Sequence, residues 1–216
     1  MKKKKSGKVY LVVLFLLILI AGFIKIKFFP KYYTAAHFGI ETVTSDYDKD
    51  GDGIDDQTDF LQGVKDYVDT KPVYKSKYYG TGYPDDGYGV CTDVVANGYL
   101  AAGYDIKTLL AQDVTDHRED YNIDIQDANI DFRRVRNLKV YLENTAQSLT
   151  IDIYDIAQWQ AGDIVVFESH IGVISDHRNK EGIPYVIHHG SLTQTSYEQD
   201  ILEEKQDEIV GPYRLN

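Results

Sequence analysis

The sequence predicts an α+β domain in which helices precede an antiparallel sheet, behind an N-terminal transmembrane helix. Apolar residues recur at helical spacing over 59–68 and over 91–103. Three short apolar segments follow, at 164–167, 170–174 and 185–189, separated by turn residues as strands usually are. A chain of 216 residues is long enough for one such domain and a short extra segment.

Charge is divided unevenly between the N-terminus and the rest of the chain. The first 27 residues hold seven lysines and no acidic residue, so the rest carries 16 basic and 34 acidic side chains. An acidic body of this kind is repelled by phosphate backbones, which argues against nucleic-acid binding.

The single cysteine excludes an intramolecular disulfide.

The N-terminus predicts export. Lysines precede an apolar run from Val9 to Ile24, which Phe28 and Phe29 can extend. We expect residues 1–30 to form cytoplasmic lysines and a single-pass signal-anchor, with the body of the protein outside the cell membrane. A cleaved signal peptide is the alternative, and it also exports the body. Residues 31–45 are interpreted as a tether.

Residues 46–72 are interpreted as a calcium-binding loop followed by a helix. The segment 48–59 has the spacing of an EF-hand-like calcium loop, with a glycine at the sharp turn. Its expected ligands to a structural Ca²⁺ are Asp48, Asp50, Asp52, the Ile54 carbonyl, Asp56 and Asp59. The alternative is a solvated acidic turn that caps the next helix.

The remaining residues, 73–216, hold the candidate catalytic groups. Cys91 follows a loop rich in glycine and tyrosine and begins a helical pattern. A helix N-terminus favours a thiolate, so we expect a nucleophile whose pKa is lowered, rather than an inert buried thiol.

A thiol nucleophile needs a base, and the base needs an orienting group. His170 begins the second predicted strand and is the expected base. His188 and His189 end the third strand, where neighbouring side chains point to opposite faces, so only one of them can share the face of His170. The same divergence makes a metal site on this pair improbable.

The motifs around these residues resemble a known family. The chain resembles the domain-of-unknown-function 1287 family at Gly89–Val95, Asp127–Val135, Gly162–Val165, His170–Val173, His188 and Gly211–Arg214. The order of Cys91 and His170 also resembles that of NlpC-type papain-like cell-wall peptidases and amidases. The resemblance implies a papain-like fold with Cys91 as nucleophile, His170 as base and His188 as orienter. Phe132 and Pro212 stand where the family usually has histidine.

Arg133 and Arg134 allow two interpretations. A guanidinium group can bind a substrate carboxylate. The favoured interpretation is a structural ion-pair network, since Asp124, Asp127 and Asp131 are close in the sequence.

These observations together predict a membrane-anchored extracellular cysteine hydrolase that cleaves peptide or amide bonds of peptidoglycan. A non-catalytic cell-wall-binding module is one alternative. A cysteine acyltransferase or transglutaminase-like enzyme is another, because it would use the same residues with an amine acceptor.

Overall fold

The computed structural model describes residues 10–20 and 32–215, which fall into two units divided after Tyr32. In the first unit, residues 10–20 are helical and exposed. Among the described residues, no helix is long and apolar enough to cross a membrane. Of the predicted signal-anchor segment 1–30, residues 1–9 and 21–30 lie outside the described residues.

The second unit contains a six-stranded sheet in the order β3-β8-β4-β5-β6-β7, with antiparallel neighbours throughout. Its strands are β3 (Gln147–Ser148), β4 (Ile164–Phe167), β5 (Ile171–Arg178), β6 (Pro184–Ile187), β7 (Glu198–Gln199) and β8 (Ile209–Arg214). A separate short parallel pair joins β1 (Val73–Tyr74) to β2 (Tyr88–Gly89). The predicted α+β class with an antiparallel sheet is confirmed, although the third predicted strand ends at Ile187, before the two histidines.

Five α-helices accompany the sheet in the described part of this unit. They are α2 (Asp56–Asp69), α3 (Cys91–Ala101), α4 (Ile106–Asp116), α5 (Ala128–Asp131) and α6 (Val135–Thr145). Short 3₁₀ turns occupy η1 (Ala35–Phe38), η2 (Arg118–Asp120) and η3 (Gln206–Glu208). The helical patterns over 59–68 and 91–103 predict α2 and α3, and the structure adds α4, α5 and α6.

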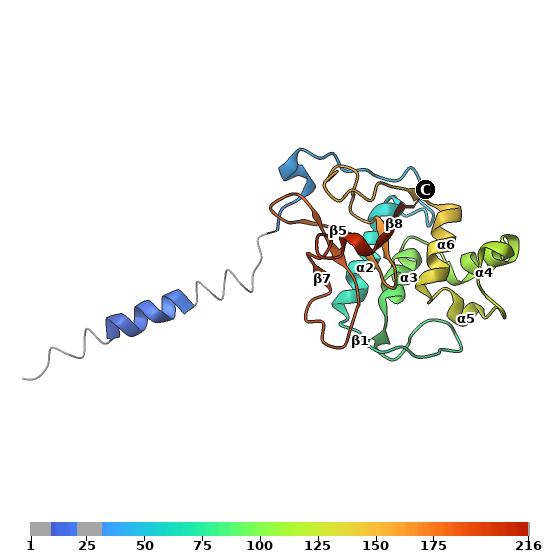
Figure 1. Cartoon of the computed structure of the whole chain (residues 1–216), viewed down its shortest axis with the longest axis horizontal. Helices are drawn as coiled ribbons and strands as arrows, with labels where there is room; N and C mark the ends of the chain where they lie inside the picture. The colour runs from blue at the N-terminus through green and yellow to red at the C-terminus, as the bar shows by residue number, and fades with distance from the viewer. Residues whose placement is uncertain (1–9, 21–31, 216) are drawn as a thin grey trace, which may run out of the picture. The chain divides into compact units, whose positions relative to one another are not determined.

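Helices α2 and α3 lie side by side, and α3 also contacts β5 (Figure 1). Two glycines allow this close approach. A Cβ atom on Gly98 would lie 2.8 Å from the Phe60 ring, and one on Gly63 would lie 2.2 Å from the Ala101 Cβ. The packing of α3 on the sheet therefore fixes the position of its first residue, Cys91.

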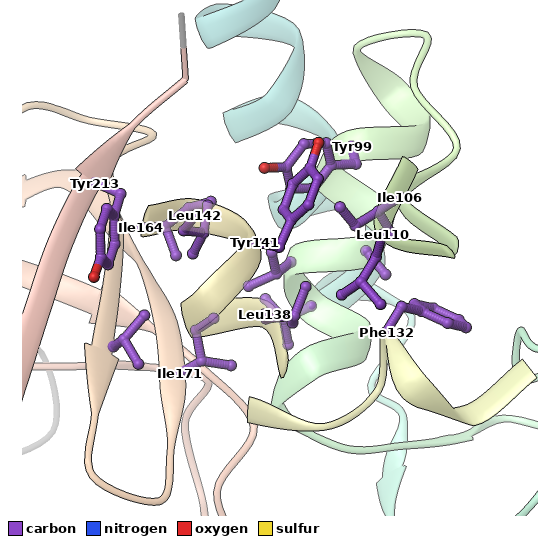
Figure 2. Packing of buried hydrophobic residues seen from close by; sticks show 14 of the residues in the cluster. Tyr99, Ile106, Leu110, Phe132, Leu138, Tyr141, Leu142, Ile164, Ile171 and Tyr213 are labelled. Carbon is purple, nitrogen blue, oxygen red and sulfur yellow. The ribbon is translucent and has the colours of Figure 1, made fainter. Parts of the chain in front are cut away.

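The larger apolar core fills the space between the helices and the sheet. Figure 2 shows Leu138 and Leu142 of α6 among residues of α3, α4 and the strands. Phe132 is fully buried in this core and packs against Tyr83, with ring centroids 5.0 Å apart. A second core, on the other face of the sheet, contains Trp159 and Phe167.

Residues 33–45 belong to the second unit and do not form the predicted tether. Tyr33 and Arg178 exchange two backbone hydrogen bonds, of 3.0 and 2.8 Å. The Gln160 side chain accepts from the Val43 N–H at 3.3 Å and donates to the Glu41 carbonyl at 3.2 Å. The segment is held by these specific bonds, which its weak apolar pattern does not reveal.

Candidate active site

Cys91 is the first residue of α3, as the sequence predicts. The start of this helix is held by Asp93, whose carboxylate accepts the Val90 N–H at 2.8 Å. Arg133 donates to both oxygens of the same carboxylate, at 2.7 and 2.8 Å, and its third bond goes to the Lys77 carbonyl at 2.6 Å. This buried clamp fixes the backbone that carries the thiol.

The clamp decides between the two interpretations of Arg133. Its side chain is buried and bound to Asp93, so it is a structural ion-pair residue. The partner differs from the expected acidic neighbours: Asp131, for example, accepts the backbone N–H of Asp127 instead. Arg134 is exposed at the start of α6.

The structure brings His170 and His188 into contact. His170 Nε2 lies 2.9 Å from His188 Nδ1, and His188 Nε2 lies 2.9 Å from the Gln199 Oε1. Because an amide oxygen only accepts, His188 carries its proton on Nε2 and accepts through Nδ1. His170 therefore donates through Nε2, which leaves Nδ1 as the basic nitrogen. No residue of the described chain forms a hydrogen bond with that nitrogen.

Local geometry explains why these two histidines meet. His170 follows the short turn after β4, where its carbonyl accepts the Phe167 N–H at 2.8 Å. Val173 pairs with Ile187, so His188 follows directly at the end of the neighbouring strand. A Cβ atom on Gly172 would lie 2.5 Å from Val186 and 3.2 Å from the His188 Cβ, so glycine is needed here for the close approach.

His189 points away from this pair. Its ring packs edge-on against Tyr74 and Tyr197, with centroids 5.3 and 5.2 Å apart. It is buried, and its Nδ1 has no hydrogen-bond partner among the described residues. Of the two neighbouring histidines, His188 is the one that forms a hydrogen bond with His170 among the described residues.

Cys91, His170 and His188 line one cleft of about 580 Å³. Its other lining residues are Tyr74, Ser169, Gly190, Ser191, Thr193, Gln194, Gln199, Lys205 and Glu208. The backbone N–H groups of Ile171 and Thr92 point to the Cys91 thiol. Since Ile171 directly follows His170, the thiol and the base lie at the same end of β5.

Burial keeps both reactive groups neutral. It raises the pKa of Cys91 to about 11, more than the nearby N–H groups lower it. Burial, together with the charges of His188 and Lys205, lowers the pKa of His170 to about 3. The expectation of a lowered thiol pKa is wrong for this structure, because the thiol is more deeply enclosed than a position at a loop–helix junction suggests.

The acidic loop brings three of its predicted ligands together. Single carboxylate oxygens of Asp48, Asp50 and Asp52 lie within 4.8 Å of one another. Asp59 faces this group, since burial and then the charges of Asp52, Asp50 and Asp48 raise its pKa. Asp56 does not join them: it is buried and accepts from the Lys49 N–H at 2.7 Å and from the Tyr104 hydroxyl.

Sequence reasoning missed Gln199 and the charged pair of the cleft, Lys205 and Glu208. Gln199 lies on a two-residue polar strand, which has no alternating apolar pattern. Lys205 precedes the 3₁₀ turn η3 and Glu208 is its last residue, in a charged segment where no sequence pattern distinguishes them.

A family model described as Domain of unknown function (DUF1287) matches residues 61–215. The chain belongs to the DUF1287 family. The chain is 31% identical over 152 residues to the Uncharacterized protein YijF of Escherichia coli (strain K12). The aligned segment covers 66% of this chain and 72% of that protein. No solved structure matches. The DUF1287 region contains Cys91, His170 and His188, whereas the acidic loop, residues 48–59, lies before it.

Proposed function

We propose that this chain is a membrane-anchored extracellular cysteine hydrolase that cleaves peptide or amide bonds in peptidoglycan. The contact of 2.9 Å between His170 Nε2 and His188 Nδ1, in the cleft that Cys91 lines, carries this proposal. The similarity of the motifs to NlpC-type papain-like enzymes supports the fold, the substrate class and the roles of these three residues.

The Cys91 thiol and the His170 imidazole are both neutral before the reaction, and this determines the first proton transfer. A separated thiolate and imidazolium are disfavoured, because burial raises the pKa of Cys91 and lowers that of His170. The Cys91 proton therefore passes to His170 Nδ1 as the sulfur attacks the carbonyl carbon. His170 then donates this proton to the leaving amine, and water releases the acyl group from the sulfur.

His188 and Gln199 keep the base in the correct tautomer. Gln199 accepts from His188 Nε2, so His188 Nδ1 stays free of a proton and accepts from His170. The Asp93 N–H already donates to the Val90 carbonyl at 3.0 Å. The N–H groups of Cys91 and Thr92, the first two residues of α3, have no acceptor in a preceding helical turn, and they are the proposed donors to the oxyanion.

Incubation of the purified protein with peptidoglycan, followed by mass analysis of the soluble fragments, tests the proposal and identifies the bond. New termini that contain ¹⁸O from labelled water are expected for a hydrolase. Products extended by an added amine would indicate an acyltransferase. Cosedimentation with peptidoglycan without any release of fragments would indicate a wall-binding module.

We also propose that the acidic loop binds structural Ca²⁺ through Asp48, Asp50, Asp52, Asp59 and the Ile54 carbonyl. Calcium that binds only the folded protein would add about 2.7 kcal/mol at one hundred times its dissociation constant. Melting in millimolar calcium and in chelator is the measurement, and Asp50→Ala is expected to remove the difference. Identical melting curves would leave the loop as a helix-capping turn.

Anchoring through the N-terminal apolar run is proposed from the lysines that precede it. Full-length protein is expected in the membrane fraction and sensitive to protease added to intact cells. A body protected from external protease would contradict export.

A further inference from the structure

The cleft around Cys91 contains one ammonium group and one carboxylate, which form a pair. Lys205 Nζ lies 2.9 and 3.0 Å from the two carboxylate oxygens of Glu208. Apart from the two histidines, no other acidic or basic side chain of the described residues lines this cleft. The charges of this pair therefore determine which charged groups of a ligand can bind in the cleft.

The backbone holds this pair next to the turn that carries the base. The Glu168 N–H donates to the Glu208 carbonyl at 2.9 Å, and Glu168 lies two residues before His170. The Glu208 N–H in turn donates to the Lys205 carbonyl at 2.9 Å. The positive charge of Lys205 lies close enough to oppose protonation of both His170 and His188.

Lys205 retains donors for a ligand. An ammonium group has three N–H donors, and Glu208 takes at most two of them. The Lys205 side chain is 32% exposed, so a further acceptor can approach it from the cleft. Arg133 cannot serve this purpose, because its side chain is buried against Asp93 and the Lys77 carbonyl and does not line the cleft.

We propose that Lys205 is a specificity-determining residue that binds a free carboxylate of the substrate peptide beside the scissile bond. The inference rests on the proposed hydrolase function and names the substrate class: stem peptides whose carboxylates are free, in preference to the same peptides with carboxamides. Glu208 holds the ammonium in place until the substrate arrives.

The test compares a synthetic stem peptide with free carboxylates and its carboxamide counterpart. The full-length wild-type protein is expected to cleave the acid form with a kcat/KM about tenfold higher, as for a charge-assisted hydrogen bond in a partly exposed site. Lys205→Met is expected to remove this preference and Lys205→Arg to retain it. Lys180→Met is the matched control, since Lys180 forms an exposed pair with Glu181 and does not line the cleft.

Affinity for the same two peptides separates this inference from the proposed function. Cys91→Ala protein is expected to bind the acid form about tenfold more tightly than the amide form, and Cys91→Ala/Lys205→Met protein to bind them equally. If the wild type cleaves neither peptide, the hydrolase proposal fails while the affinity ratio still decides the role of Lys205. Cleavage or binding with the same preference after Lys205→Met would overturn the inference.

Discussion

The protonation states of the reactive side chains in the cleft depend on burial more than on position in the sequence. Cys91 stands at a helix start, which favours a thiolate, yet its side chain is 9% exposed. The cost of burying a charge exceeds the gain from the helix N-terminus and raises the pKa of Cys91. The type and order of the reactive residues are readable from sequence, whereas their protonation states depend on packing that sequence does not show.

Alkylation of Cys91 is expected to be slow near neutral pH. A thiol whose pKa is about 11 in place of 9.0 carries roughly one hundredth of the thiolate at pH 8. The rate of iodoacetamide labelling of the native protein is therefore expected to rise about tenfold per pH unit up to pH 10. A labelling rate that levels off below pH 8.5 would show that the helix start outweighs burial.

The two neighbouring histidines are expected to respond differently to substitution. His188→Ala removes the acceptor of the His170 N–H and is expected to lower kcat by a factor of about 10² or more. His189→Phe removes a buried nitrogen without a described partner and retains an aromatic ring between Tyr74 and Tyr197. We expect it to keep kcat within about threefold and the free energy of unfolding equal or higher.

Steady-state kinetics and urea denaturation of both variants measure these effects. Equal losses of kcat in His188→Ala and His189→Phe, with both proteins folded, would remove His188 from the proposed triad.

At the scale of elements, the start of α3 depends on a clamp from a distant segment. Asp93 is fully buried and receives two bonds from Arg133, forty residues later in the chain. Sequence reasoning placed the helix and an ion pair correctly but chose partners close in sequence. The true partner is set by how α3 packs against the turn between α5 and α6, a contact that no local pattern encodes.

Arg133→Met is expected to destabilise the fold by about 3–5 kcal/mol, because it leaves the Asp93 carboxylate buried without its partner. The exposed neighbour Arg134 provides the matched control, and Arg134→Met is expected to change stability by less than about 0.5 kcal/mol. Urea denaturation of the two variants measures the difference. Equal stability of both would mean that the clamp does not hold α3.

At the scale of the whole molecule, the sheet order explains how distant segments form one cleft. β5 is central between β4 and β6, so His170 at its start and His188 after β6 become neighbours although eighteen residues separate them. The apolar segment at 164–167 matches β4, whereas β5 continues to Arg178, beyond the predicted end at residue 174. The short polar strands β3 and β7, and helices α4 and α5, carry weak patterns and depend on tertiary contacts for their formation.

The fold is expected to lose stability in mild acid. Burial lowers the pKa of His170, His188 and His189 below the usual 6.5. Below pH 6.5 the unfolded chain binds protons that the folded chain does not, so stability is present above this pH and falls as the pH decreases.

The expected loss between pH 6.5 and 5 is up to about 1.4 kcal/mol per pH unit for His170, and His188 and His189 add to it in the same direction. The exposed His117 opposes this trend, because its hydrogen bond to the Asp113 carboxylate raises its pKa. Urea denaturation at pH 7, 6 and 5 measures the slope, and His189→Phe is expected to reduce it. A free energy of unfolding that is constant over this range would show that the folded protein binds protons as readily as the unfolded chain, against a lowered pKa for these rings.

The most direct test of the central claim is release of peptidoglycan fragments by the wild-type protein and by Cys91→Ala. Cys91→Ala removes one buried sulfur atom and keeps the Cβ atom, so melting curves of both proteins are recorded first to establish that the variant is folded. The wild type is expected to release fragments with new peptide or amide termini, and Cys91→Ala none above the background of peptidoglycan alone. Equal release by a folded Cys91→Ala protein would contradict the assignment of Cys91 as the nucleophile.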